Sequence, residues 1–131
     1  MLGGAAVPAQ WLAWLLPAGR ILFVSYFIAM GLSHLLNYGE HSRVLDRKGM
    51  PLPHAATVLT IVTMVGGGAL LLTGWHARIG ALLLFFIIFP APFFLHRFWK
   101  ETDAYMRLSE FAHLMKDLSL AGAALVFFAI S

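Results

Sequence analysis

Four long apolar stretches, separated by polar connections, dominate the hydrophobic pattern of the chain. They cover residues 18–37, 54–74, 78–95 and 110–131. Each is close to the roughly 20 residues with which an α-helix crosses a bilayer, and none alternates as a strand does. The pattern therefore predicts an all-α integral membrane protein. We expect one antiparallel, up-down-up-down four-helix bundle, a single membrane domain over residues 1–131.

The apolar stretch at residues 9–16 is too short to cross a membrane. It contains Trp11 and Trp14, and Pro17 follows it. Indole rings favour the headgroup level, which predicts an interfacial segment. The alternative is one first helix that continues through a kink at Pro17.

Local signals predict helix ends and helix faces. Pro90 and Pro92 should kink or end the third span early. Ser109 is the expected N-cap of the fourth span, and residues 38–53 are expected to include a short amphipathic turn at the membrane surface. One face of the second span combines small, hydroxyl and apolar residues, a composition typical of helix interfaces: Thr57, Thr60, Met64, Gly67 and Leu71.

Composition and charge agree with a membrane location. The chain is 60% hydrophobic and 11% charged, whereas soluble domains are about 25% charged. It has no cysteine, which excludes disulfides and thiolate metal sites. The net charge of +3 indicates the lipid bilayer as a partner and no nucleic acid, because the cations lie beside apolar runs.

The basic residues predict an orientation. The opposite side of the bundle carries Arg20 and Arg78, whereas the two long connections, 38–53 and 96–109, hold six basic residues: Arg43, Arg47, Lys48, Arg97, Lys100 and Arg107. The positive-inside rule places both connections in the cytoplasm and the N- and C-termini outside.

Ionisable residues converge on one end of the predicted bundle: His34, His54, His96, Glu110, His113, Lys116 and Asp117. Glu110, His113 and Asp117 share one stripe of the fourth span. Only 14 of the 131 residues follow Asp117, too few to cross a ~30 Å core. Asp117 should therefore lie within the hydrocarbon zone and face the bundle.

Three interpretations of this cluster remain open. In the first it is structural, with Lys116 paired to a carboxylate and the histidines joining helices. In the second it binds the headgroup of a quinone-like molecule or a lipid, because histidine and lysine can donate to a carbonyl. The candidate binding residues are His34, His96, Trp99, Glu110, His113, Lys116 and Asp117. No catalytic residue is predicted.

The third interpretation is a mononuclear metal site formed by His34, Glu110 and His113. Glu110-x-x-His113 has the spacing used in di-iron four-helix bundles. That constellation needs a second such motif, and neither Glu40 nor Glu101 begins one. The metal interpretation is therefore the least favoured.

Short motifs also occur in a recognisable order over residues 20–127: Arg20-Ile-Leu-Phe, Gly31-Leu-Ser-His34-Leu-Leu, Gly49-Met-Pro-Leu-Pro53, Gly67-Gly68, Ala77-Arg78-Ile-Gly-Ala, His96-Arg-Phe-Trp99 and His113-Leu-Met-Lys116-Asp117. This order resembles the DoxX family of small bacterial membrane proteins. The chain departs from the family pattern at Met64, where many members carry a glutamate, and at Asp117, where asparagine is common.

The resemblance implies a four-helix protein of the bacterial cytoplasmic membrane that is associated with redox systems. One branch of the family is a subunit of a thiosulfate:quinone oxidoreductase, so a quinone ligand and a redox protein partner are expectations. The chain could itself be a membrane subunit of a quinone-linked oxidoreductase. A homo-oligomer is a further alternative, and more distant relatives act as cargo receptors.

Overall fold

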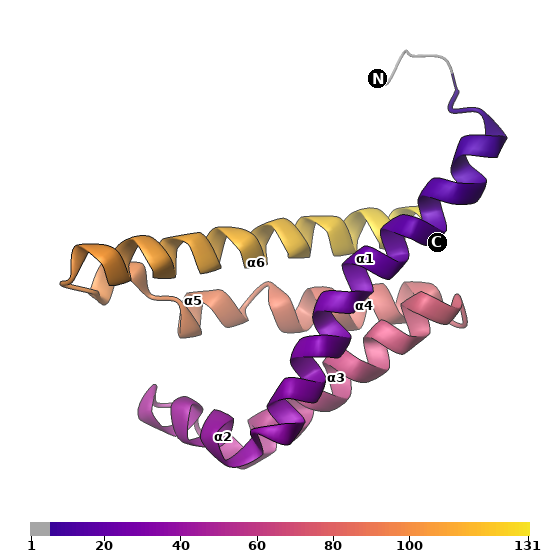
Figure 1. The fold of residues 1–131 in the computed structure, drawn as a ribbon. Coiled ribbons are helices and arrows are strands. Elements are labelled where there is room, and N and C mark those ends of the chain that lie inside the picture. The colour runs from indigo at the N-terminus through magenta and orange to yellow at the C-terminus, as the bar shows by residue number, and fades with distance from the viewer. Residues whose placement is uncertain (1–5) are drawn as a thin grey trace.

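The computed structural model describes residues 6–131, and over those residues it is built entirely from helices and their connections (Figure 1). The elements are α1 (Ala9–Leu36), α2 (Tyr38–Arg47), α3 (Pro53–Thr73), α4 (Ala77–Ile88), α5 (Ala91–Leu95), η1 (Phe98–Lys100) and α6 (Ala104–Ile130). Four segments are long and apolar enough to cross a membrane: α1, α3, α6 and the stretch Ala77–Lys100. The predicted all-α architecture of four long apolar helices is confirmed.

The helices pack in sequence, α1 against α3, α3 against α4, and α4 against α6. Figure 1 shows the α1–α3 and α4–α6 pairs diverging from one end of the molecule. We call that end, where the α3–α4 turn and the end of α6 lie, the closed end. The other, where α2 and the start of α6 lie, is the open end. Both termini of the described chain lie toward the closed end, but which side of the membrane it faces stays a prediction.

Glycines set how closely the helices approach one another. A Cβ atom built on Gly80 would lie 2.6 Å from the carbonyl oxygen of Gly67, and one on Gly31 would lie 2.7 Å from a Val65 methyl group. A Cβ on Gly68 would lie 3.1 Å from Ile28. Both α3 interfaces therefore depend on residues without side chains, as is common between membrane helices.

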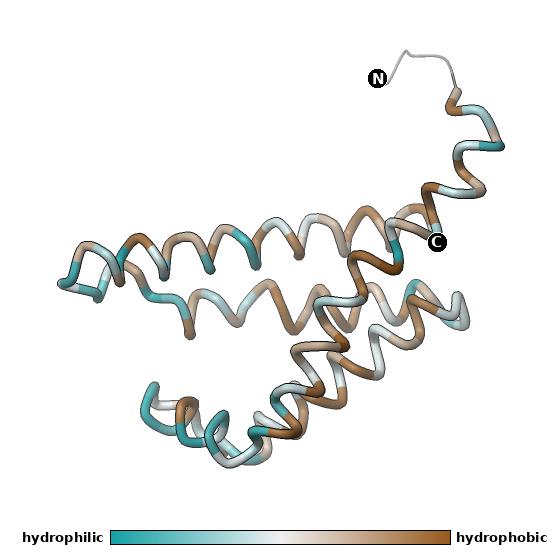
Figure 2. The backbone as a smooth tube through the Cα atoms, viewed as in Figure 1, coloured by the Kyte–Doolittle hydropathy of each residue, from teal (hydrophilic) through white to brown (hydrophobic). Residues whose placement is uncertain are grey.

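The interior and exterior of the bundle are both apolar. The predicted α3 face is the packed one, since Thr57, Met64 and Leu71 are buried. Large apolar side chains such as Leu22 and Phe86 point outward and are 74% and 67% exposed. Figure 2 shows hydrophilic segments gathered mainly at the open end. An apolar outer surface of this extent suits contact with lipid chains.

The prolines at positions 17 and 90 affect their helices differently. Residues 9–16 are the first turns of α1, which continues through Pro17. The backbone of this part of the chain is thus one continuous helix, as in the alternative, and the interfacial location of residues 9–16 stays a prediction. The third span divides as expected, because α4 ends at Ile88 and α5 begins after Pro90.

Two connections differ from the expectations. Residues 38–47 form the ten-residue helix α2, which is longer than the short turn expected there. The prediction of Ser109 as N-cap is wrong, because α6 begins at Ala104. The side chain of Asp103 accepts a hydrogen bond from the Met106 backbone N–H at 2.9 Å. This N–H is one of those in the first turn that have no carbonyl partner within the helix.

Candidate functional site

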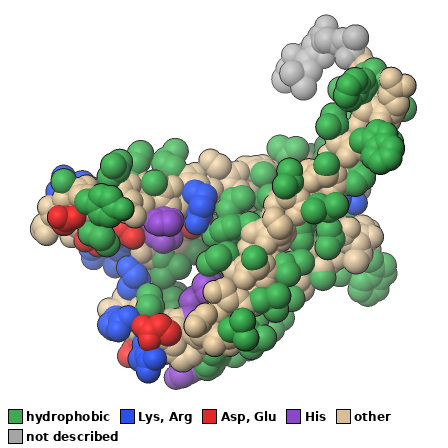
Figure 3. Space-filling view, viewed as in Figure 1, with side chains coloured by type: hydrophobic (Ala, Val, Ile, Leu, Met, Phe, Trp, Pro, Cys, Tyr) green, Lys and Arg blue, Asp and Glu red, His purple; other side chains and the backbone are tan. Residues whose placement is uncertain are grey.

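A cavity of about 700 Å³ lies between the diverging helix pairs at the open end. Figure 3 shows a hollow between two arms of the molecule, with charged and histidine side chains near it. Met30, Met64, Ile88 and Phe94 contribute apolar walls. Polar side chains line the cavity on both sides, from α6 and the segment after α5 on one side and from α1, α2, the segment after α2 and α3 on the other. The cavity therefore joins a large apolar surface to a confined group of hydrogen-bonding side chains.

His96 is the centre of the polar wall. Its Nδ1 atom lies 3.1 Å from Glu110 Oε2, and its Nε2 atom lies 3.6 Å from Asp117 Oδ2. Glu110 and Asp117 are seven residues apart on α6, about two helical turns, so they share one face and one imidazole can reach both. A neutral imidazole can donate to only one of these carboxylates, whereas the imidazolium can donate to both.

Asp117 and Lys116 extend this wall toward α1. Asp117 is 4% exposed, and its Oδ1 atom lies 3.4 Å from Lys116 Nζ. Oδ1 has no hydrogen-bond partner in the described chain, so this contact is electrostatic without hydrogen-bond geometry. The Lys116 ammonium also lies 4.9 Å from the ring centre of Tyr26 on α1. Lys116 thus pairs with its sequence neighbour Asp117 and also contacts Tyr26 on another span.

The wall on the other side of the cavity contains two neighbouring histidines. The rings of His34 and His41 lie 4.0 Å apart. His41 Nδ1 lies 3.1 Å from Thr57 Oγ1, while Thr57 donates to the Pro53 carbonyl at 2.9 Å. Because the hydroxyl has one hydrogen, Nδ1 must be the protonated nitrogen of a neutral His41. Burial lowers the pKa of His41, which favours this neutral form.

The structure brings together most of the candidates named from the sequence. Six of the seven line the cavity: His34, His96, Glu110, His113, Lys116 and Asp117. Trp99 is 53% exposed and does not line it. His54, expected as a further wall, instead faces Tyr38, with Nδ1 3.2 Å from the phenol oxygen.

Three ionisable residues that line the cavity were missed by sequence reasoning: Tyr26, His41 and Lys48. Lys48 donates to the Leu95 carbonyl at 2.9 Å and so joins the two arms at the cavity rim. The spacing of His41 from His34 gave no signal, because seven residues of continuous helix would separate them by about 10 Å along the axis. The helix break at Asn37 is what brings the two rings to 4.0 Å.

The three weak metal candidates do not form one site. Within residues 6–131, no three His, Asp or Glu side chains are arranged to hold a metal ion. Glu110 is engaged by His96, while the ring of His34 lies against that of His41 on the facing wall.

Comparison with known proteins shows which family the chain belongs to. A sequence model of the family described as DoxX matches residues 7–97, more than half of the chain. The chain belongs to the DoxX family. The match runs from α1 to the end of α5, and it stops before α6. The resemblance predicted from the short motifs is confirmed, and together with the four apolar helices it makes this an integral membrane protein of DoxX type.

One curated relative covers nearly all of this DoxX protein. The chain is 27% identical over 123 residues to the protein called Inner membrane protein YphA from Escherichia coli (strain K12). The alignment covers 94% of this chain and 84% of that protein, so it extends over most of α6, beyond the region of the family match. No solved structure matches the chain.

Proposed function

We propose that this DoxX protein lies in the bacterial inner membrane and binds the headgroup of a quinone-like molecule in the open-end cavity, as a redox-associated component. The observation that carries the proposal is the cavity itself, in which apolar walls meet a confined polar cluster. An amphipathic ligand with an apolar tail and carbonyl oxygens matches both parts. The name of the E. coli relative supports the inner-membrane location.

His113 and Lys116 are the best-placed donors for a ligand carbonyl. His113 is exposed to the cavity, stacks on His96 with ring centres 5.0 Å apart, and forms no hydrogen bond or ion pair within residues 6–131. Lys116 is also exposed and carries three N–H groups, of which the Asp117 contact occupies at most one. Glu110 and His96 are engaged with each other and would act by holding the donors in place.

The alternative is a membrane scaffold in which the cluster only joins helices. The pairing of His96 with two carboxylates favours it, because paired polar groups also stabilise helix contacts inside membranes. The two functions differ at His113. A structural cluster does not need its unpaired ring, whereas a ligand site does.

His113→Ala tests the proposal. In detergent-solubilised protein titrated with a short-chain ubiquinone by calorimetry, we expect about tenfold weaker binding, the value of one hydrogen bond to a charged or strongly polar group. The melting temperature should stay close to that of the unsubstituted protein, because His113 makes no hydrogen bond within residues 6–131. His54→Ala is the matched control, since it removes an exposed histidine at the same end but outside the cavity. If the unsubstituted chain takes up no quinone, the scaffold function is favoured. If quinone binds but both variants bind it equally well, His113 is not the donor.

A further inference from the structure

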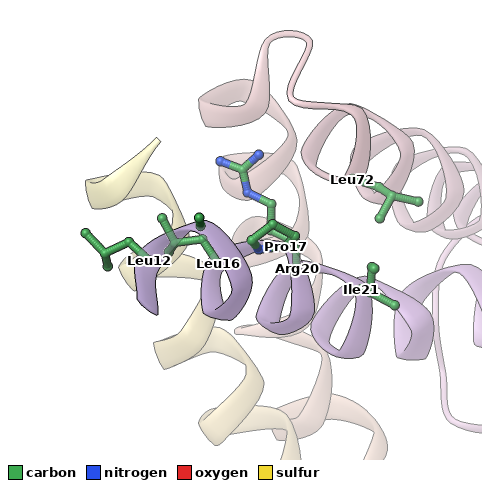
Figure 4. A pocket seen from close by; sticks show the side chains of 7 residues that line it. Leu12, Leu16, Pro17, Arg20, Ile21 and Leu72 are labelled. Atoms are coloured by element: carbon green, nitrogen blue, oxygen red, sulfur yellow. The ribbon is translucent and has the colours of Figure 1, made fainter. Parts of the chain in front are cut away.

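A second cleft, of about 460 Å³, lies at the closed end, far from the polar cluster. It runs between the first turns of α1 and the end of α3. Figure 4 shows Leu12, Leu16, Ile21 and Leu72 around it, with the side chain of Arg20 extending from α1. Arg20 is the one charged residue among the described side chains that line the cleft.

Arg20 has no counter-ion in the described chain. Within residues 6–131 it forms no hydrogen bond or ion pair, and its buried Nε atom lacks a hydrogen-bond partner. A guanidinium among apolar side chains is costly to leave unpaired. Arg78 lies at the same end but outside the cleft, and its guanidinium carbon is 5.8 Å from the Phe128 ring centre. The cleft therefore presents a positive charge for which the described chain supplies no anion.

Arg20 also lies at the depth where lipid phosphates are found. Its Nη1 atom is 3.5 Å from the position of a Cβ on Gly74, so the guanidinium is level with the turn between α3 and α4. Turns of a membrane bundle lie at its water interface. Trp75 in that turn and Trp14 on α1 are 68% and 80% exposed, as in an aromatic belt.

We propose that this cleft binds an anionic phospholipid, with the lipid phosphate on the Arg20 guanidinium and an acyl chain along Ile21 and Leu72. The planar fork of arginine suits a phosphate diester, which can accept two parallel hydrogen bonds. Ile21 is 58% exposed and Leu72 is 41% exposed, so both offer apolar surface to an acyl chain. This site is separate from the open-end cavity and does not depend on the function proposed for it.

The test is native mass spectrometry of the detergent-solubilised chain with added phosphatidylglycerol or phosphatidylcholine. We expect preferential binding of phosphatidylglycerol. Arg20→Gln should weaken that binding about tenfold or more, whereas Arg78→Gln should change it less than about twofold. Both variants remove one positive charge at the same end of the bundle. An equal effect of the two would show general charge attraction and overturn the site.

Ala13→Trp provides a second variant that leaves Arg20 in place. Ala13 is exposed and lines the cleft, so an indole there should fill it without disturbing the core. We expect it to weaken phosphatidylglycerol binding as Arg20→Gln does. The proposal is contradicted if Ala13→Trp leaves phosphatidylglycerol binding unchanged, or if the two lipids bind equally well. It is also contradicted if a second copy of the chain, and not a lipid, occupies the cleft.

Discussion

Gly80→Ala is expected to lower the free energy of unfolding by about 1–3 kcal/mol, the usual cost of overpacking a close interface. The added Cβ would lie 2.6 Å from the Gly67 carbonyl oxygen and 2.8 Å from the Leu71 backbone nitrogen. Both are backbone atoms of α3, so they cannot rotate away as a side chain can. The two helices must separate instead. Unfolding of the solubilised protein by sodium dodecyl sulfate, followed by circular dichroism, measures the loss.

Gly66→Ala is the matched control for this prediction. Gly66 lies on α3, next to the Gly67 that faces Gly80, but a Cβ on Gly66 would meet no atom of the described chain within 4 Å. Alanine is also favoured over glycine in a helix by roughly 0.5–1 kcal/mol. This variant should therefore be as stable as the unsubstituted protein, or more stable. Equal losses in the two variants would mean that α3 and α4 are not packed as closely as described.

His96→Ala should cost about 2–3 kcal/mol, because it leaves two poorly exposed carboxylates without their partner. The Glu110 side chain is 17% exposed, and that of Asp117 is 5% exposed. Neutralising one carboxylate should reverse part of the loss, so the double variant His96→Ala/Asp117→Asn is expected to be more stable than His96→Ala alone. The same sodium dodecyl sulfate titration gives all the values.

His54→Ala controls for the loss of a histidine at the open end. His54 is exposed and contacts only Tyr38 among aromatic side chains of the described chain. We expect its effect to stay within about 0.5 kcal/mol, as for most surface substitutions. If His96→Ala is as mild as His54→Ala, the pairing of His96 with Glu110 and Asp117 does not contribute to stability.

Much of the fold follows from hydrophobic periodicity. The α3 face predicted from residue spacing is the face that packs, with Thr57, Met64 and Leu71 buried and Gly67 against α4. Periodicity succeeds here because a helix inside a bundle must direct its small and packing residues toward its neighbours. The end of α4 before Pro90 could also be predicted from the sequence, since proline removes a backbone donor.

The start of α6 and the shape of the cavity were harder to predict from the sequence. Ser109 and Asp103 are both good N-cap residues, and only the hydrogen bond from Met106 shows that Asp103 is the one used. The approach of His41 to His34 depends on the direction that the chain takes at Asn37. The divergence of the two helix pairs, which opens the cavity and leaves Trp99 outside it, depends on packing between distant segments. Local sequence signals do not encode such long-range geometry.

The proposed binding of an amphipathic headgroup in the open-end cavity can be tested by a structure of the solubilised chain with short-chain ubiquinone. We expect quinone density between His34 and His113, with a carbonyl oxygen at about 3 Å from a donor of His113 or Lys116. Quinone bound elsewhere on the chain would rule out this site. A cavity closed by Lys116 and Tyr26, with no quinone in it, would do the same.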